Sequence, residues 1–331
     1  MKAVQLTAFG NAVDGLVLRD IDEPSRPGPG EVLVQVAYAP INVNDLMVAW
    51  GVYDWKPALP EILGNEGAGI VLDVGSGVDG FSPGTPVILP FMSRTWRERL
   101  LVRAGELTAL PPDADLEQAS MATINAVTAA LLLDVYVDLR PGDAVAYNAA
   151  SSGLGHWLAG LASRQGLRTV GLVRKPEDID RVQSTSGCET VLLDSDDARN
   201  DPRLAGLRIR LALDGVGGAS AGRLAALLGP DGALVAYGAA SHQPMHVSAQ
   251  DLIFKRIAVY GFFEGQPEHR SRIAETLGKL TGLLRPDGIR QPVAAVYPAS
   301  RLKDAVAHAV AGGKVLLAFG GDQSDRSVGS S

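Results

Sequence analysis

Residues 144–155 of this chain read AVAYNAASSGLG, and this stretch decides the fold. A short apolar run, Ala144–Asn148, predicts a strand, and the following turn of small residues leads into LGHWLAGLASRQ, which has the length of a helix. Such a turn lets backbone N–H groups approach a pyrophosphate at the positive end of the helix. The usual G-x-G-x-x-G pattern is degraded, with Ala150 and Ser152 in its first two glycine positions and only Gly155 retained. A plain strand-to-helix turn capped by serine is the structural alternative.

The chain beyond this stretch continues in a strand–helix–strand rhythm. Helix-length segments such as SAGRLAALLG separate most of the apolar runs. This alternation predicts a parallel, doubly wound sheet of α/β class. The strand candidates are Ala144–Asn148, Thr169–Val173, Thr190–Leu193, Ile209–Asp214, Ala233–Tyr237 and Ile257–Phe262.

The first hundred or so residues have a different rhythm. Short apolar runs such as KAVQL and GEVLVQVAYAPI alternate with Gly/Pro turns, which predicts a β-rich unit. Residues 116–136 lack Gly and Pro and predict a helix that leads into the second fold. The last helix and strand, in RLKDAVAHAVAGGKVLLAF, are expected to return to the first domain. We therefore expect a substrate domain at 1–117 and 293–321, a nucleotide-binding domain at 118–292, and a flexible tail at 322–331.

Composition excludes several classes of function. The 331 residues carry a formal net charge of −7 with a pI near 5.3, which argues against general nucleic-acid binding. No stretch approaches the roughly 20 apolar residues that span a bilayer, and the first residues read as a strand instead of a signal peptide. The single cysteine, Cys188, excludes an internal disulfide and fits a reducing cytoplasm.

Two cations follow the second predicted strand of the nucleotide-binding domain. Proteins that bind the adenosine ribose of NAD usually place an acidic residue here, whereas this chain has Arg174, Lys175 and Pro176. Arginine and lysine pair with a 2′-phosphate, and cations ahead of a helix oppose its dipole, so a purely structural role for both is weak. The sequence therefore predicts NADPH as the cofactor, with an exposed basic turn as the alternative.

Metal ligands are missing where zinc dehydrogenases of such two-domain architecture need them. The relevant stretches read Asn42-Val43-Asn44-Asp45 and Gly64-Asn65-Glu66-Gly67, without cysteine or histidine. A lone Glu66 is no zinc site, and its default role is that of a hydrogen-bonded structural partner. We expect no metal.

NADPH is a hydride donor, and hydride transfer to a polarised double bond also needs a proton donor. The loop Trp50–Trp55 is aromatic, contains glycine and lies close in sequence to GNEG, and Tyr53 in it is a candidate donor. A tyrosine in water has a pKa of about 10 and is protonated at neutral pH. An apolar ring with a wet hydroxyl is the ordinary structural role of such a residue.

The ordered motifs together resemble those of the 2-enoyl thioester reductases, zinc-free medium-chain reductases of fatty-acid metabolism, and more distantly those of NADPH quinone reductases. The likeness runs from about Met1 to Phe319. It implies a GroES-like β-rich substrate domain joined to a doubly wound Rossmann domain. The motifs that carry it are INVNDL, GVYDW-x4-P-x3-GNEG, TWRE, INAVTAA, LRPGD, YNAASSGLG, GLRTVGLVR, DGVGG, YGAAS and LIFK-x5-GFF.

The resemblance also implies roles for individual residues. Tyr53 matches the catalytic tyrosine, the proton donor at the α-carbon of the enoyl group. Phe263 stands where the family often has tryptophan, and Asp54 and Trp55 beside Tyr53 are not typical of it. The residues implied in cofactor binding are Asn125, Ser151, Ser152, Gly153, Leu154, Arg174, Lys175, Pro176, Tyr237, Gly238, Ala239, Ala240, Phe262, Phe263, Glu264, Gly265 and Lys314.

The expected activity is NADPH-dependent reduction of a trans-2-enoyl thioester to the saturated thioester. Two alternatives stay open: a quinone or enone reductase of the same fold, and an NADPH-binding protein without catalysis. We also expect a homodimer, because Ile257–Phe262 should be the last strand of its sheet and an apolar edge invites pairing with a second copy.

Overall fold

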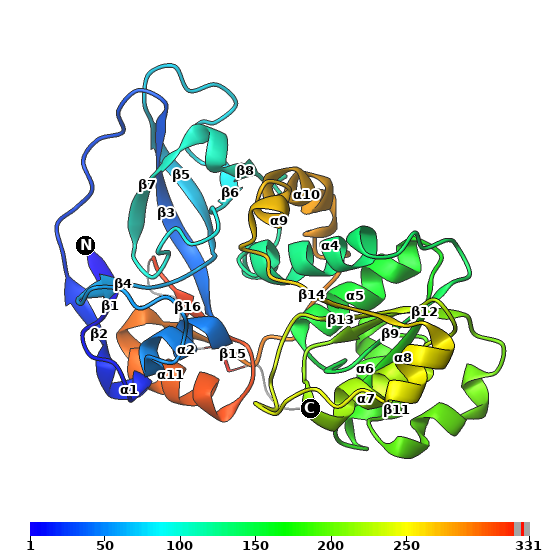
Figure 1. Ribbon diagram of the computed structural model, residues 1–331. Coiled ribbons are helices and arrows are strands. Elements are labelled where there is room, and N and C mark those ends of the chain that lie inside the picture. Colours follow the sequence, from blue (N-terminus) through cyan, green and yellow to red (C-terminus); the bar gives the residue numbers. More distant parts are fainter. Residues whose placement is uncertain (321–325, 328–331) are drawn as a thin grey trace. The chain divides into compact units, whose positions relative to one another are not determined.

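The structure, a computed structural model, describes residues 1–320 together with Arg326 and Ser327 (Figure 1). Tertiary contacts divide the chain into two compact units. Unit 1 comprises Met1–Ile124, Leu277–Gly288 and Pro292–Ser331, and unit 2 comprises Asn125–Thr276 and Ile289–Gln291.

The main sheet of unit 1 is organised around β3 (Glu31–Ile41). This strand pairs antiparallel with β5, β7 and β16, and its alternating Val32, Val34 and Val36 are fully buried. The period of two places one apolar face against the core. The strand order is β17-β15-β16-β3-β5-β6-β8, with β7 pairing β3. The other strands are β5 (Ala68–Val74), β6 (Pro86–Ile88), β7 (Arg99–Arg103), β8 (Thr108–Ala109), β15 (Ala295–Pro298), β16 (Val315–Ala318) and β17 (Arg326–Ser327).

A second, three-stranded sheet of unit 1 has the order β2-β1-β4. The core of the unit also includes buried apolar residues from three helices, among them Ala12, Leu46 and Val306. The elements are β1 (Lys2–Leu6), β2 (Leu16–Asp20), β4 (Glu61–Ile62), α1 (Ala12–Gly15), α2 (Val43–Trp50), α3 (Leu116–Ala119) and α11 (Leu302–Ala311).

Unit 2 holds a six-stranded parallel sheet in the order β11-β10-β9-β12-β13-β14. The central strand β9 (Ala144–Tyr147) is buried along its whole length, as expected of a parallel sheet covered on both faces. The remaining strands are β10 (Arg168–Val173), β11 (Thr190–Leu193), β12 (Ile209–Asp214), β13 (Ala233–Ala236) and β14 (Ala258–Gly261). The helices are α4 (Val127–Val135), α5 (Gly153–Arg164), α6 (Asp178–Ser186), α7 (Gly218–Leu227), α8 (Ala249–Lys255) and α9 (Pro267–Arg270); α10 (Ile273–Leu280) spans the boundary between the units.

The doubly wound sheet is confirmed, and each of the six expected strands is present within one residue of its expected ends. The C-terminal helix and strand do return to the first fold, since β16 pairs with β3. The single helix expected at 116–136 is wrong: α3 ends at Ala119, a π-helix follows at Ala122–Ala126, and α4 then begins at Val127. The expected flexible tail at 322–331 lies outside the described residues except for β17.

In the part of the chain that the structure describes, no helix is both long and apolar enough to cross a membrane.

Candidate active site

The turn after β9 leads into the N-terminus of α5, whose first backbone N–H groups are available to a ligand. Ser152 is the N-cap of α5, and its hydroxyl accepts a hydrogen bond from the N–H of Gly155 at 3.1 Å. The first N–H groups of any helix have no intrahelical partner, so those of Gly153 and Leu154 are directed toward the end of the helix. An anion at this end would accept them and meet the positive end of the helix dipole.

The degraded glycine pattern is compensated by the neighbouring strand. Ala150, in the first glycine position, is fully buried, and a Cβ placed on Gly171 of β10 would lie 2.8 Å from the Ala150 methyl. The missing side chain at Gly171 therefore makes room for alanine in the turn. At Gly155 there is no room for a side chain, because a Cβ there would lie 2.5 Å from the Ala150 carbonyl oxygen. That contact explains why this glycine alone is retained.

A buried polar network supports the turn from below. The Asn148 amide donates to Asp214 Oδ1 at 2.6 Å and to Ser220 Oγ at 2.9 Å, and it accepts from the N–H of Gly215 at 2.8 Å. Asp214 Oδ1 also accepts from the N–H groups of Val216 and Gly217. The network fixes the turn after β9 to the loop after β12, and sequence reasoning missed it.

The cations after β10 are exposed. Arg174 has no hydrogen bond or ion pair with any residue that the structure describes. Lys175 lies 4.0 Å from Glu177, and both of those side chains are largely exposed. Because β9 and β10 are parallel neighbours, the turn after β9 and these cations follow strand ends at one edge of the sheet.

Asn125 lies in the π-helix, a rare geometry that is frequent at functional sites. Its amide donates to Gln291 Oε1 at 2.6 Å. A Cβ on Gly153 would lie 2.2 Å from that same oxygen and 2.8 Å from Asn125 Nδ2. The structure thus brings Asn125 together with the turn after β9, and its expected place beside the nicotinamide stays a prediction.

The remaining residues of unit 2 expected to bind cofactor follow the carboxyl ends of β13 and β14, which belong to the same parallel sheet. Phe262 is buried and stacks on His269, whose Nδ1 contacts the Phe263 carbonyl oxygen at 2.8 Å. Phe263 itself is 52% exposed. These residues are Tyr237, Gly238, Ala239, Ala240, Phe262, Phe263, Glu264 and Gly265.

In unit 1, Tyr53 follows the end of α2. The helix ends at Gly51 in the left-handed conformation (φ 76°), and the N–H of Tyr53 then donates to the carbonyl of Met47 at 3.2 Å. The ring is partly buried against the core of the unit. The position of Tyr53 is therefore set by the same helix whose first turn carries Asp45.

That first turn belongs to a network of buried polar side chains. Lys314 Nζ donates to Asn42 Oδ1, and Asn42 Nδ2 donates to Glu66 Oε1 at 3.0 Å. Glu66 Oε2 accepts from the N–H of Ile124 at 2.8 Å, so both of its oxygens are used. Asp45 Oδ2 caps the helix by accepting from the N–H of Asn42 at 2.9 Å. The expectation that Glu66 is a hydrogen-bonded structural partner is confirmed.

Burial shifts the ionisation of this network. It raises the pKa of the Asp45 carboxyl to about 7, and the charge of Glu66 adds to that rise while Lys314 and backbone N–H groups oppose it. Burial likewise raises the pKa of Glu66 and lowers that of Lys314. The two acids and the lysine thus lie in one buried cluster, in which the Asp45 carboxyl exchanges its proton near neutral pH.

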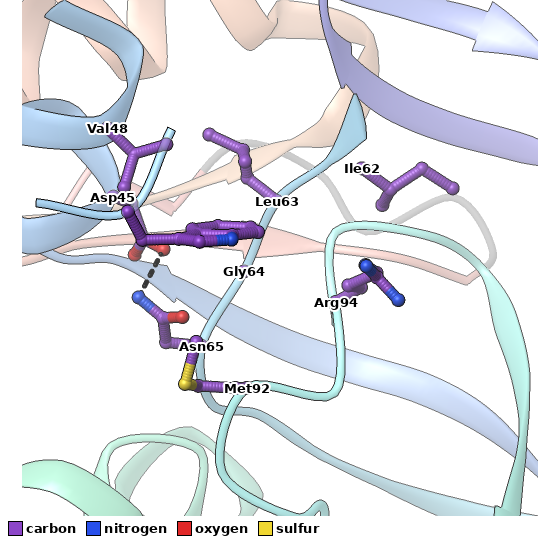
Figure 2. Close-up of a pocket in the computed structure, with 9 residues that line it drawn as sticks. Asp45, Val48, Ile62, Leu63, Gly64, Asn65, Met92 and Arg94 are labelled. Atoms are coloured by element: carbon purple, nitrogen blue, oxygen red, sulfur yellow. Dashed lines mark hydrogen bonds between the residues drawn. The ribbon is translucent and has the colours of Figure 1, made fainter. Parts of the chain in front are cut away.

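Next to the network lies a cavity of about 260 Å³, which Figure 2 shows. Asn65 lines it and donates from Nδ2 to Asp45 Oδ1 at 2.9 Å. Gly64 precedes it with φ 103°, and a Cβ there would lie 2.5 Å from Thr95 Oγ1, so only glycine fits. The lining residues are Asp45, Val48, Trp55, Ile62, Leu63, Gly64, Asn65, Met92 and Arg94.

The residues at this position do not fit a zinc ion. The oxygens of Asn42, Asp45 and Glu66 already accept hydrogen bonds within the protein, and the amide oxygen of Asn65 is not among the usual ligands of zinc. Within the described ranges, no group of three or more His, Cys, Asp or Glu side chains is arranged to hold a metal. The single cysteine is buried in unit 2. Zinc independence stays a prediction.

Sequence reasoning named Tyr53 and Lys314 but did not identify Asn42, Asp45 and Asn65 as parts of one network. Their signal was present in NVND and GNEG, where amides and acids stand in place of metal ligands. The spacing of these residues along the chain hides the contact, because β16 brings Lys314 back beside β3 only in the folded unit.

Comparison with known proteins identifies both parts of the chain. Residues 28–106 match the alcohol dehydrogenase GroES-like domain, and residues 153–281 match the zinc-binding dehydrogenase family. The chain is 34% identical to the mitochondrial enoyl-[acyl-carrier-protein] reductase of Caenorhabditis elegans over 281 residues, which cover 81% of each chain. It is also 34% identical to the human enzyme of that name, covering 81% of this chain and 74% of that one.

Solved structures agree in fold. The Etr1p/NADP/crotonyl-CoA complex superposes with a TM-score of 0.84 at 24% identity, covering 96% of this chain and 99% of that one; Etr1p is a 2-enoyl thioester reductase of Candida tropicalis. A putative NADPH:quinone reductase from Bacillus thuringiensis superposes with a TM-score of 0.83 at 26% identity and the same coverage. This chain therefore belongs to the medium-chain dehydrogenase/reductase family of oxidoreductases, to which the enoyl-[acyl-carrier-protein] reductases also belong.

Proposed function

We propose that this protein reduces trans-2-enoyl thioesters to saturated acyl thioesters with NADPH. The observation that carries the proposal is the joint presence of two features. Unit 2 has a helix N-terminus suited to phosphate and exposed cations after the neighbouring strand, and unit 1 has Tyr53 directly after α2, the helix whose Asp45 and Val48 line the cavity. Relatives at 34% identity over most of the chain are enoyl reductases by name, which supports the choice of substrate.

The residues of unit 2 fit NADPH. The N-terminus of α5 would hold the pyrophosphate, and a side chain at Gly153 would close the space between this turn and the Asn125–Gln291 pair. Arg174 and Lys175 would pair with the 2′-phosphate, because Arg174 has no ion pair with any described residue and Lys175 has only an exposed one with Glu177, at 4.0 Å. Ser151, Leu154 and the loops at 237–240 and 262–265 complete the proposed cofactor site.

When bound, NADPH supplies the hydride that reduces the β-carbon of the enoyl group. The electrons of the double bond then move toward the thioester, and negative charge develops on its oxygen. Tyr53 donates its phenolic proton to the α-carbon as this charge collapses, and the phenolate regains a proton from water. Lys314, within the buried network of unit 1, would in its protonated form favour anionic states in its surroundings.

Steady-state kinetics tests the proposal. With NADPH as donor, turnover of crotonyl-CoA should exceed that of a simple quinone. Faster quinone turnover would support a quinone reductase, and tight NADPH binding without turnover of either substrate would support a non-catalytic role.

We further propose that the protein forms a homodimer through β14. This strand lies at the edge of the six-stranded sheet, and its Val259 and Tyr260 are 46% and 45% exposed. An edge strand with exposed apolar side chains pairs readily with its twofold mate. Light scattering at micromolar concentration should give about twice the 34.6 kDa of one chain, and a monomer mass would contradict the proposal.

For the compartment, we propose the reducing cytoplasm, because the single cysteine of the chain fits a compartment that keeps thiols reduced. The relatives are named as mitochondrial enzymes. Cell fractionation with an antibody to this chain distinguishes the two compartments.

A further inference from the structure

One polar group that lines the cavity of unit 1, the Asn65 amide, differs from the others in its hydrogen bonding. Five of its lining residues, Val48, Trp55, Ile62, Leu63 and Met92, are apolar or aromatic. Arg94 is a donor and pairs with Glu61 at 2.8 Å. Each oxygen of Asp45 already accepts a hydrogen bond, from Asn65 or from the N–H of Asn42.

Asn65 differs from these residues because its acceptor atom, Oδ1, is free to accept a hydrogen bond from a ligand. Its Nδ2 is held by Asp45, and Oδ1 receives no hydrogen bond from any residue in the described part of the chain. In Figure 2 the amide nitrogen of Asn65 points to Asp45 and its oxygen is turned away. An uncommitted acceptor in a mostly apolar cavity favours ligands that carry a donor, because a ligand without one desolvates the acceptor and leaves it unpaired.

We propose that Asn65, oriented by Asp45, is the specificity residue that accepts a hydrogen bond from the amide N–H of the carrier arm of a thioester substrate. This inference rests on the proposed function. Carrier arms built as S–CH₂–CH₂–NH–CO place an amide N–H two carbons from the thioester sulfur. A simple quinone offers carbonyl acceptors and no N–H, so the same group discriminates against it.

Asp45 acts here as a positioning residue. Ionised Asp45 leaves the Asn65 oxygen free for a ligand, and protonation of Asp45 reverses the orientation of the Asn65 amide. Oδ2 accepts from a backbone N–H, which cannot be turned round, so a proton added on Oδ1 leaves this hydrogen bond intact. Protonated Oδ1 is a donor, and the Asn65 amide must then rotate to offer its oxygen to Asp45. The cavity loses its acceptor in that state.

Burial of Asp45, together with the charges around it, places this change near neutral pH. Burial raises its pKa to about 7, with Glu66 adding to the rise and Lys314 and the N–H groups of Asn42 and Gly64 opposing it. Arg94, on the cavity wall, is engaged by Glu61. The acceptor should therefore face the cavity above about pH 8 and be withdrawn progressively below pH 7.

Two thioesters that differ in one atom test the proposal: S-(2-acetamidoethyl) thiocrotonate, which carries the N–H, and S-(2-acetoxyethyl) thiocrotonate, which has an ester oxygen there. At pH 8 the wild type should prefer the amide by about three- to tenfold in kcat/KM, the value of one neutral hydrogen bond. The ratio should fall toward 1 below pH 7. Ionisation of Tyr53 or of the cofactor cancels in this ratio, because both substrates undergo the same chemistry.

Two variants separate recognition from folding. Asn65→Leu removes the acceptor, and Asp45→Asn places a donor against Asn65 and so turns its oxygen away; both should bring the ratio near 1 at every pH. Asp73→Asn, at an exposed acid of β5, should keep the wild-type ratio and its pH dependence.

The outcomes are distinct. A wild-type ratio near 1 at pH 8 with both thioesters reduced would overturn this inference alone, as would an unchanged ratio in Asn65→Leu. Failure of the wild type to reduce either thioester would overturn the proposed function and this inference with it. Where a variant does not fold, the pH dependence of the wild-type ratio decides.

Discussion

The polar groups of the two units differ in what they contact. In unit 1, Asp45 and Glu66 are buried, and every oxygen of the two carboxylates is hydrogen-bonded within the protein. In unit 2, Arg174 and Lys175 are exposed, and the nearest acid to Lys175 is 4.0 Å away. Buried charges must be paired by the fold itself, whereas an exposed cation that is unpaired, or paired only at the limit of an ion pair, can pair with a ligand. The buried carboxylates of unit 1 hold the neighbouring side chains in position, and the exposed cations of unit 2 are available to bind a ligand.

Tyr53→Phe should produce the largest effect, because it removes the proposed proton donor and keeps the ring. We expect kcat with crotonyl-CoA to fall by roughly 10²–10⁴. The dissociation constant of NADPH should hardly change, since the phosphate-binding groups belong to unit 2. Tyr297→Phe is the matched control: this tyrosine of unit 1 contacts His308 at 3.1 Å, and its variant should keep wild-type kcat. A Tyr53→Phe enzyme with wild-type kcat would remove Tyr53 from the chemistry.

Asp45→Asn tests the buried side of the comparison through stability. The folded-state pKa of about 7 exceeds the usual 3.8, so the folded protein holds a proton that the unfolded chain releases between those values. The free energy of unfolding therefore falls as pH rises from about 4 to 7. The variant side chain cannot ionise, so the free energy of unfolding should not fall in this way. Relative to the wild type, the variant should be more stable by on the order of a few kcal/mol at pH 8 and by little at pH 4.

Urea unfolding of both proteins at the two pH values measures this gain. A variant less stable than the wild type at pH 8 would show that the ionised Asp45 is the stabilising form.

Arg174→Ala with Lys175→Ala tests the exposed side. Charge-assisted hydrogen bonds contribute roughly 1.5–3 kcal/mol, so the double variant should lose about tenfold or more in NADPH affinity and little in NADH affinity. Titration calorimetry with both cofactors measures the two constants. Arg203→Ala, which removes an arginine already paired with Asp201, should leave them unchanged. An equal loss for both cofactors would contradict recognition of the 2′-phosphate.

Metal chelation should have no effect. The amides and acids of the unit 1 network are engaged with one another, so we expect no stoichiometric zinc and full activity after treatment with EDTA. One tightly held zinc per chain in elemental analysis would contradict this expectation.

The two regions also differ in how far the sequence alone predicts them. The turn after β9 was predictable because strand, small residues and helix are contiguous, and the parallel sheet follows from the repeated alternation around it. The compensation of Ala150 by Gly171 was not, since it depends on the register between β9 and β10. The Asn42–Asp45–Glu66–Lys314 network joins residues up to 272 positions apart, and no local pattern encodes such a contact. The break of the helix at Ala119 also escaped sequence reasoning, because residues 116–136 contain no Gly or Pro to mark it.

Transfer of a labelled hydride tests the central claim most directly. The protein is incubated with NADPH deuterated at the transferable C4 position and with crotonyl-CoA, and the butyryl product is examined by mass spectrometry and NMR. We predict one deuterium at the β-carbon and none at the α-carbon, which should instead take its hydrogen from water by way of Tyr53. Absence of deuterium from the thioester, or deuterium at the α-carbon, would contradict the proposed reaction.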